Sequence, residues 1–219
     1  SRCLRVLVHD FAGHPFQIDL SRALARRGHQ VRHVYCRSYT SGKGDLERPE
    51  PNLSVVSVPA GDSFARYSPV RRVRQELAYG ARFTRVAAEF RPDVILACNV
   101  PLVAKMVSAT WCAGRRVPWV FWLQDLHSVA MATEAENRAG RAGRLLGRAF
   151  EAIERALLRR ADGVVSITDD FEPVLGRWGV DRDRCTVIEN WAPLADLPLR
   201  PRCNRWRERM GLGERFVFL

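Results

Sequence analysis

Short apolar runs rich in β-branched and aromatic residues alternate with amphipathic segments along most of the 219 residues. The expected strands cover residues 4–9, 31–35, 53–58, 93–98, 118–123, 163–167 and 185–188, and the expected helices cover 16–27, 69–90, 101–113, 143–160 and 171–178. Such alternation is typical of a parallel sheet that helices cover on both faces. The sequence therefore predicts an α/β fold with a Rossmann-like, doubly wound parallel sheet.

This fold class also predicts where function lies. Right-handed crossovers place the loops that follow the strands along one edge of the sheet. Ligands of open α/β sheets bind at that edge, near the point where the strand order reverses. We therefore expect functional residues within 10–15, 99–101, 124–128 and 168–170.

Composition limits the class of protein more than it defines an activity. No run approaches the roughly 20 consecutive apolar residues of a membrane span, and the six cysteines are scattered without a Cys-x-x-Cys pair. We expect a cytoplasmic protein with neither a disulfide framework nor a metal site, and with no cofactor. The 35 basic and 24 acidic residues give a net charge of +11, and Lys43 and Lys105 are the only lysines. A genome-wide preference for arginine and attraction to an anionic surface both explain this charge.

Gly13 and His14 lie in the loop between the first expected strand and helix. Glycine lets backbone N–H groups approach a phosphate near a helix N-terminus, and histidine can donate to a sugar or phosphate oxygen. A tight turn is the alternative for Gly13, and a structural or solvent-exposed position is the alternative for His14. Both are candidate substrate-binding residues.

Gln124 and Asp125 directly follow the apolar run 118–123. A carboxylate accepts from sugar hydroxyls, and a glutamine amide both donates and accepts. They are the candidate catalytic residues, with Asp125 expected to orient an acceptor hydroxyl rather than to act as a general base. Helix capping is the alternative role of Asp125, and it is the favoured role of the pair Asp169 and Asp170.

An arginine stripe lies on one side of the helix expected around residues 143–160. At about 100° per residue, the stripe gathers Arg141, Arg144, Arg148, Arg155 and Arg159. The opposite, apolar side is expected to pack on the sheet (Leu145, Leu146, Ala149, Phe150, Ile153, Ala156 and Leu157). A solvated face with Glu151 paired to Arg155 explains the stripe. A membrane-facing surface against anionic lipid headgroups is the alternative.

Three segments follow one another in a familiar order. They are Arg-Gly-His-Gln-Val at 27–31, Arg-Pro-Asp-Val-Ile at 91–95, and ADGVVSITDDFEPVLGRWGVDRDRCTVIENW at 161–191. Together they resemble the N-terminal domain of retaining family 4 glycosyltransferases of the GT-B class. The Trp-Leu-Gln-Asp-Leu run at 122–126 and the Glu-Asn-Trp-Ala run at 189–192 are most similar to bacterial enzymes that build polysaccharides on lipid-linked acceptors.

The resemblance implies that this chain forms the acceptor side of a cleft. A second domain, carrying the family's paired glutamates, would supply most contacts to the nucleotide-sugar donor. Residues 1–195 would then form the acceptor-side domain, and 196–219 a linker and the start of the donor-binding domain, with a strand-like run at 215–219. Asn190 falls at the hinge, where it is a candidate substrate-site residue that supports the crossover backbone.

Two positions depart from the family pattern. The first loop often carries paired glycines, whereas Ala12-Gly13 offers one. Many members also place a histidine, often followed by aspartate, at the end of the fifth strand. Here Gln124-Asp125 stands at that place and His127 follows two residues later, so His127 is a candidate substrate-binding residue without the usual family role.

The implied function is sugar transfer, with retention of configuration, from a nucleotide-sugar donor to a glycan or lipid-linked acceptor. We expect a hexosyltransferase-like enzyme of polysaccharide biosynthesis when the protein is full length, peripheral on the inner face of a membrane, and an inactive fragment without the second domain. The alternative is a non-catalytic Rossmann-type module that binds a nucleotide or metabolite. Nucleic acid is not an expected partner, because no recognised nucleic-acid-binding motif is present.

Overall fold

Seven parallel strands form the centre of the molecule. The computed structural model describes residues 2–61, 69–192 and 201–217. The strands are β1 (Arg5–His9), β2 (Gln30–Cys36), β3 (Leu53–Val58), β4 (Val94–Ala97), β5 (Trp119–Leu123), β6 (Gly163–Ser166) and β7 (Cys185–Val187). They lie in the order β3-β2-β1-β4-β5-β6-β7, so the order reverses between β1 and β4. The predicted Rossmann-like parallel sheet is confirmed.

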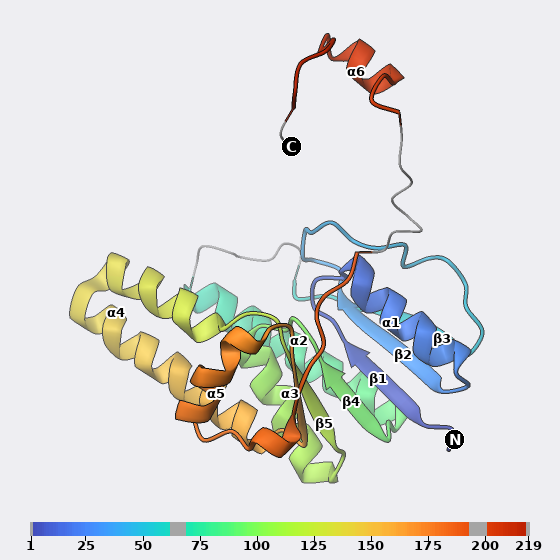
Figure 1. The fold of residues 1–219 in the computed structure, drawn as a ribbon. Coiled ribbons are helices and arrows are strands. Elements are labelled where there is room, and N and C mark those ends of the chain that lie inside the picture. Colours follow the sequence, from blue (N-terminus) through green and yellow to red (C-terminus); the bar gives the residue numbers. More distant parts are fainter. Residues whose placement is uncertain (1, 62–68, 193–200, 218–219) are drawn as a thin grey trace.

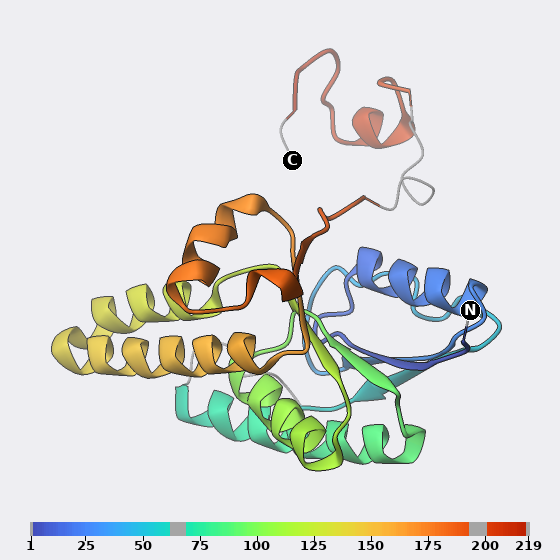
Figure 2. The same cartoon turned by 60° about the horizontal axis from the view of Figure 1, so that its bottom comes forward.

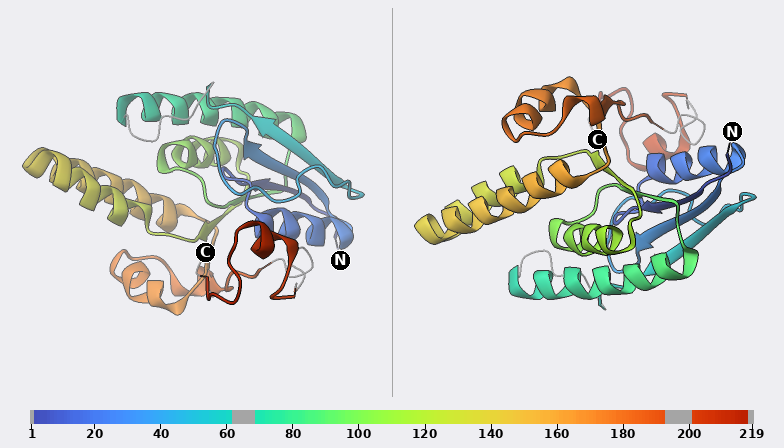
Figure 3. Two further views of the ribbon diagram at one scale, coloured as in Figure 1. Left: turned by 90° about the horizontal axis from the view of Figure 1, so that it is seen from above. Right: turned by 90° about the horizontal axis from the view of Figure 1, so that it is seen from below.

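Helices cover both faces of this sheet (Figures 1 and 3). The helices are α1 (Pro15–Arg26), α2 (Pro69–Phe90), α3 (Leu102–Arg115), α4 (His127–Arg160), α5 (Glu172–Arg177) and α6 (Arg205–Arg209), with short 3-10 turns at Asp169–Phe171 and Arg182–Arg184. In the ribbon, α1 lies on one face, and α2 and α3 lie on the other. The sheet is therefore wound on both sides, as the alternation predicts.

The alternation of side chains along β1 explains the two layers. Val6 and Val8 pack into the cluster that contains Phe16 and Leu20 of α1, whereas Leu7 packs into the larger cluster with Phe83 of α2. Successive side chains of a strand point to opposite faces. A strand that is apolar at every position is therefore buried by helices on both sides.

The α4 segment differs from the prediction, because it is a helical hairpin rather than one helix over 143–160. Gly140 has a φ of +51°, and the arms 127–139 and 141–160 run back along each other (Figures 1 and 2). The arms touch closely, since a Cβ on Gly147 would lie 2.6 Å from the Cβ of Ala132. Small residues at the crossing allow this approach of the two backbones.

The hairpin also corrects the predicted apolar face. Leu145 is 66% exposed and Leu146 is 46% exposed, and Ala149 and Ala156 are exposed as well. Gly143 and Gly147 of the return arm (141–160) face the first arm (127–139). The leucines of the return arm therefore point to solvent. Only the later part of the predicted face packs inward, with Phe150 and Ile153 partly buried and Leu157 buried.

The last described segment holds a second correction. Residues 215–217 are not a strand, and 218–219 lie outside the described residues. The unpredicted helix α6 begins instead after Asn204, whose side chain accepts from the backbone N–H groups of Trp206 and Arg207. This segment stands apart from the sheet and its helices in Figure 1.

Candidate active site at the sheet edge

Loops from β1, β4 and β5 meet where the strand order reverses. Nε2 of His127, in the first turn of α4, lies 3.1 Å from Oδ1 of Asn99, which follows β4. Nδ2 of Asn99 lies 3.5 Å from Nε2 of His14, at the N-cap of α1. Two of the predicted substrate-binding histidines are thus brought together by a third residue, in partly buried positions. Nδ1 of His127 is itself buried, and it has no hydrogen-bond partner among the described residues.

A buried carboxylate holds the loop that carries His127. Glu154, on the return arm of α4, accepts from the backbone N–H of His127 at 3.1 Å and from that of Ser128 at 2.9 Å. Burial raises the pKa of Glu154, but the hydrogen bonds from His127 and Ser128 outweigh burial and leave this pKa lowered. The carboxylate is therefore ionised at the N-terminus of a helix, where negative charge is favoured.

A second buried network supports Gln124. The side-chain amide of Gln17, oriented with its nitrogen toward Asp10, donates to both oxygens of that carboxylate and accepts from Nε2 of Gln124 at 2.8 Å. Asp10 also accepts from the backbone N–H of Ala12 at 3.0 Å and lies 3.4 Å from Nε2 of His33. Gln124 is thus buried, and through Gln17 it connects the loop after β5 to Asp10 in the loop after β1.

Asp125 is placed differently from its neighbour Gln124. Its side chain is exposed, and within the described part of the chain it takes part in no hydrogen bond or ion pair. It does not cap α4, because the N-cap residue is Leu126 and Glu154 takes the first N–H groups. A free carboxylate at this edge is available to a ligand hydroxyl.

Gly13 lies under the loop between β2 and β3. It has a φ of +80°, a backbone conformation that favours glycine, and a Cβ there would lie 3.2 Å from Cγ of Lys43. The backbone N–H of Gly44 donates to the Gly13 carbonyl at 2.9 Å. Lys43 itself donates to Ser41 and to the carbonyl of Tyr39. One of the two lysines is therefore beside the glycine loop.

Asn190 is exposed, and it forms no hydrogen bond among the residues described. Its neighbour Trp191 anchors the end of the domain instead. The Trp191 ring stacks on Trp122 at 5.9 Å between centroids and meets Phe16 edge-on at 6.0 Å. The crossover segment is thus fixed next to the α1 side of the same sheet edge.

Lys105, the second lysine of the sequence, lies below the sheet edge that carries the candidate residues. Lys105 of α3 is buried, its ammonium lies 3.6 Å from the centroid of the Phe121 ring, and it has no hydrogen-bond partner among the described residues. Burial lowers the pKa of Lys105 from 10.5 to about 7, against the opposing charge of Glu154. His9, stacked on Phe83 at 3.6 Å, has a pKa held well below its usual value by burial and by Lys105.

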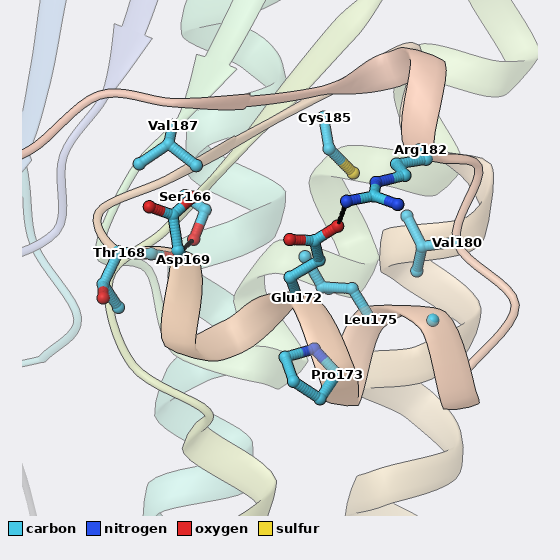
Figure 4. Close-up of a pocket in the computed structure, with 11 residues that line it drawn as sticks. Ser166, Thr168, Asp169, Glu172, Pro173, Leu175, Val180, Arg182, Cys185 and Val187 are labelled. Atoms are coloured by element: carbon cyan, nitrogen blue, oxygen red, sulfur yellow. Dashed lines mark hydrogen bonds and ion pairs between the residues drawn. The ribbon is translucent and has the colours of Figure 1, made fainter.

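A separate pocket of about 570 Å³ opens beside β6, β7 and α5 (Figure 4). Ser166, Thr168 and Asp169 line one side, and the ion pair between Glu172 and Arg182 lies across from them. Thr168, not the predicted Asp169 or Asp170, caps the turn that follows β6, because its hydroxyl accepts from the N–H of Asp170. None of the candidate catalytic or substrate-binding residues lines this pocket.

The five stripe arginines are all exposed on the return arm of α4. Arg144 donates to Glu136 of the first arm at 2.6 Å. Glu151 and Arg155, both described, form no ion pair with each other, so the predicted Glu151–Arg155 pair is wrong. Among the described helices, none combines the length and apolar character that a membrane span requires.

Sequence reasoning missed Asp10, Gln17, Asn99 and Glu154 as individual site residues. Asp10 and Asn99 lie within or next to the segments expected to be functional, because each follows a strand. Gln17 and Glu154 lie inside helices, and only the folded contacts reveal that they support the edge. A glutamate among apolar neighbours was the one available signal for Glu154.

Comparison with known proteins identifies the family. The model of the glycosyl transferase 4-like domain matches residues 17–191. A search among curated proteins finds no sequence match.

Solved structures share the fold at low identity. Sucrose-phosphate synthase from Thermosynechococcus elongatus has a TM-score of 0.58 and 18% identity, over 96% of this chain and 53% of that chain. HepE of Anabaena in complex with UDP-glucose has a TM-score of 0.56 and 17% identity, over 96% and 50%. Os79 from O. sativa in complex with UDP has a TM-score of 0.58 and 17% identity, over 93% and 57%. The chain spans about half the length of these structures. The family match and the Rossmann-like sheet together show that the chain belongs to the glycosyl transferase 4-like family, as a glycosyltransferase domain of the GT-B class.

Proposed function

We propose that this domain forms the acceptor side of a retaining, hexosyltransferase-like enzyme. The enzyme would move a sugar from a nucleotide-sugar donor to a glycan or lipid-linked acceptor. The observation that carries the proposal is the meeting of His14, Asn99 and His127 at the switch point of a glycosyltransferase domain. The relatives solved with UDP and UDP-glucose support a nucleotide-sugar donor.

The side chains at the edge suit recognition of hydroxyl groups. Imidazole and amide groups both donate and accept hydrogen bonds, and the free carboxylate of Asp125 accepts them. We assign Asp125 to an acceptor hydroxyl, with Gln124 holding the loop through Gln17. Gly13 and the neighbouring Lys43 provide the backbone and the charge that a phosphate would need.

The division of labour between domains belongs to the same proposal. Residues 1–195 form the acceptor-side domain, and 196–219 lead into a donor-binding domain. A chain that spans half the length of its structural relatives supports this division. Asn190 lies at the hinge, next to the anchored Trp191.

The protein would act on the cytoplasmic face of a membrane, in polysaccharide biosynthesis, if its acceptor is lipid-linked. The exposed arginine stripe and the net charge of +11 support attraction to anionic headgroups. The exposed Leu145 and Leu146 lie on the same arm and add apolar contact. The membrane surface is therefore proposed on the return arm of α4.

The activity test compares two lengths of chain. We expect residues 1–219 alone to release no UDP from UDP-glucose and no GDP from GDP-mannose, because the donor-binding domain is missing. The gene product extended through the next domain should hydrolyse one of these donors or transfer its sugar, with the product anomer read by proton NMR. Robust turnover by residues 1–219 alone would contradict the division, and an inverted product would contradict retention.

A further inference from the structure

Four side chains connect the return arm of α4 to the loop after β1. Glu154 accepts from the backbone of His127, Nε2 of His127 faces Oδ1 of Asn99 at 3.1 Å, and Nδ2 of Asn99 faces Nε2 of His14 at 3.5 Å. The residues come from α4, from the loop between β4 and α3, and from the N-cap of α1. This series of contacts therefore extends across the switch point, from α4 to α1.

The Asn99 amide determines which histidine nitrogens carry hydrogen. An amide oxygen only accepts, so Nε2 of His127 must donate to it. An amide nitrogen only donates, so Nε2 of His14 must be the accepting nitrogen of its ring. A neutral imidazole that accepts on Nε2 carries its hydrogen on Nδ1. His14 then offers Nδ1–H as a donor.

Glu154 fixes the position of His127 rather than sharing a ring hydrogen. Its carboxylate lies 3.8 Å from Nδ1 of His127, which is too long for a hydrogen bond. Its shorter contacts, at 3.1 and 2.9 Å, go to the first two backbone N–H groups of α4. Since Leu126 supplies no side-chain cap, Glu154 supplies it from 27 residues away.

We propose that Glu154 and Asn99 are positioning residues that set the ring hydrogens of His127 and His14. The arrangement leaves Nδ1–H of His14 as the donor for a sugar hydroxyl, whereas Nε2 of His127 is held by Asn99 and its Nδ1 is buried. The purpose rests on the proposed function, but the arrangement itself does not. The partners come from distant parts of the sequence, so the pattern exists only in the folded domain.

Nitrogen-15 NMR of the 219-residue chain tests the arrangement without any activity, because the chain has only five histidines. With labelled histidine, we expect the ring hydrogen on Nε2 of His127 and on Nδ1 of His14. Glu154→Gln should shift the His14 ring signals in the wild-type background, and this shift should vanish in an Asn99→Ala background. Glu151→Gln, which changes an exposed glutamate on the same arm, is the matched control and should shift neither ring.

With Glu154→Gln folded, two NMR results would overturn the inference. One is a His14 ring that carries its hydrogen on Nε2. The other is an effect of Glu154→Gln on His14 that is the same with and without Asn99. If Glu154→Gln does not fold, Asn99→Ala alone decides, because it must convert His14 to a mixture of ring forms, and an unchanged His14 would also overturn the inference.

The transferase containing both domains gives the second readout. Asn99→Ala should lower kcat/KM for the acceptor about tenfold, a loss of about 1.4 kcal/mol, whereas Glu151→Gln should leave it unchanged. An unchanged kcat/KM in Asn99→Ala would contradict the assigned purpose. If the NMR pattern holds but the extended wild-type protein transfers no sugar, the proposed function fails and the positioning arrangement stands.

Discussion

At the scale of single residues, Asp125 is the candidate whose substitution should affect catalysis while leaving stability almost unchanged. It is exposed and has no protein partner among the described residues. We expect Asp125→Ala to lower kcat/KM in the two-domain enzyme by about 10- to 100-fold, because a lost hydrogen bond to a charged group costs about 1.5–3 kcal/mol. Stability should change by no more than about 0.5 kcal/mol, as for other surface positions.

Paired steady-state kinetics and thermal melts check this expectation. Asp125→Asn is the conservative control, since it keeps one accepting oxygen and should lose less activity than Asp125→Ala. A lower melting temperature with an unchanged kcat/KM would assign Asp125 to a structural role.

Lys105 gives a residue-scale prediction about stability and pH. Burial lowers the pKa of its amine from 10.5 to about 7 in the folded state. Above about pH 7 the unfolded chain therefore binds more protons at this site than the folded domain does. The Lys105 contribution to the free energy of unfolding should rise with pH there, by about 2 kcal/mol between pH 7 and about 8.5. Below pH 7 the full cost of burying the charged amine remains.

Lys105→Met removes this dependence. We expect the variant to exceed the wild type in free energy of unfolding by the largest amount at about pH 6, and the excess to shrink by about 2 kcal/mol at pH 8.5. Urea denaturation at several pH values measures both proteins, and shared groups such as the thiols cancel in the difference. An excess that does not depend on pH would mean that Lys105 does not titrate in this range.

The sequence could indicate the edge of the sheet at which candidate residues lie, because the ends of parallel strands share one edge. His14, Gln124, Asp125 and His127 were chosen because they lie after expected strands, whereas Asp10 and Asn99 in the same loops were not singled out. Glu154 could not be found so, because its contact with His127 depends on how α4 folds back. A helix pattern shows which residues share a face, but it does not show which loop that face meets.

At the scale of elements, the α4 hairpin depends on glycines at the crossing of its arms. A Cβ on Gly143 would overlap the backbone of Ala135, whereas a Cβ on Gly114 of α3 would meet no atom of the described residues within 4 Å. We expect Gly143→Ala to destabilise the domain by about 1–3 kcal/mol, the usual cost of overpacking. Gly114→Ala, the matched control, should be neutral or stabilising by up to about 1 kcal/mol.

Urea denaturation gives the two free energies, and hydrogen exchange locates the effect. Exchange should increase in residues 127–160 of Gly143→Ala and not in α1 or β2. Equal stability of the two variants would show that the arms can separate at no cost.

The hairpin also shows why element boundaries were harder to predict than elements. β3 and α2 match their predicted ranges, since strong apolar periodicity ends at a glycine-, proline- or asparagine-containing loop. The first arm of α4 was missed because residues 127–139 carry few large apolar side chains. Their helix is stabilised by contact with the return arm, which local periodicity does not report.

At the scale of the whole molecule, the order of elements was enough to predict the parallel sheet. Helices separate most of the consecutive strands, which leaves few alternatives to a doubly wound fold; β2 and β3 are joined by the loop 37–52 instead. The C-terminal segment lacked this constraint. Residues 215–217 read as a strand by composition, but a strand needs a neighbour to pair with, and no described residue pairs with them.

The proposed membrane association depends on the charge of the whole surface as well as on the arginine stripe. The stripe arginines are exposed, but Arg144 is already paired with Glu136, so Arg141, Arg148 and Arg155 are the better residues to change. Each arginine near an anionic surface contributes about 1 kcal/mol, and salt screens the attraction. We expect the protein to co-sediment with vesicles containing phosphatidylglycerol at low salt, to bind neutral vesicles weakly, and to lose most binding when these three arginines become glutamine.

The control must remove the same charge from elsewhere on the molecule. Arg27, Arg37 and Arg85 are also exposed, but they lie just after α1, just after β2 and on α2. Changing these three to glutamine lowers the net charge equally, so it should reduce binding only slightly if the α4 arm is the contact surface. Equal loss in the two triple variants would show that total charge, rather than the stripe, attracts the protein. Binding that neither variant changes would leave the stripe as an ordinary solvated helix face.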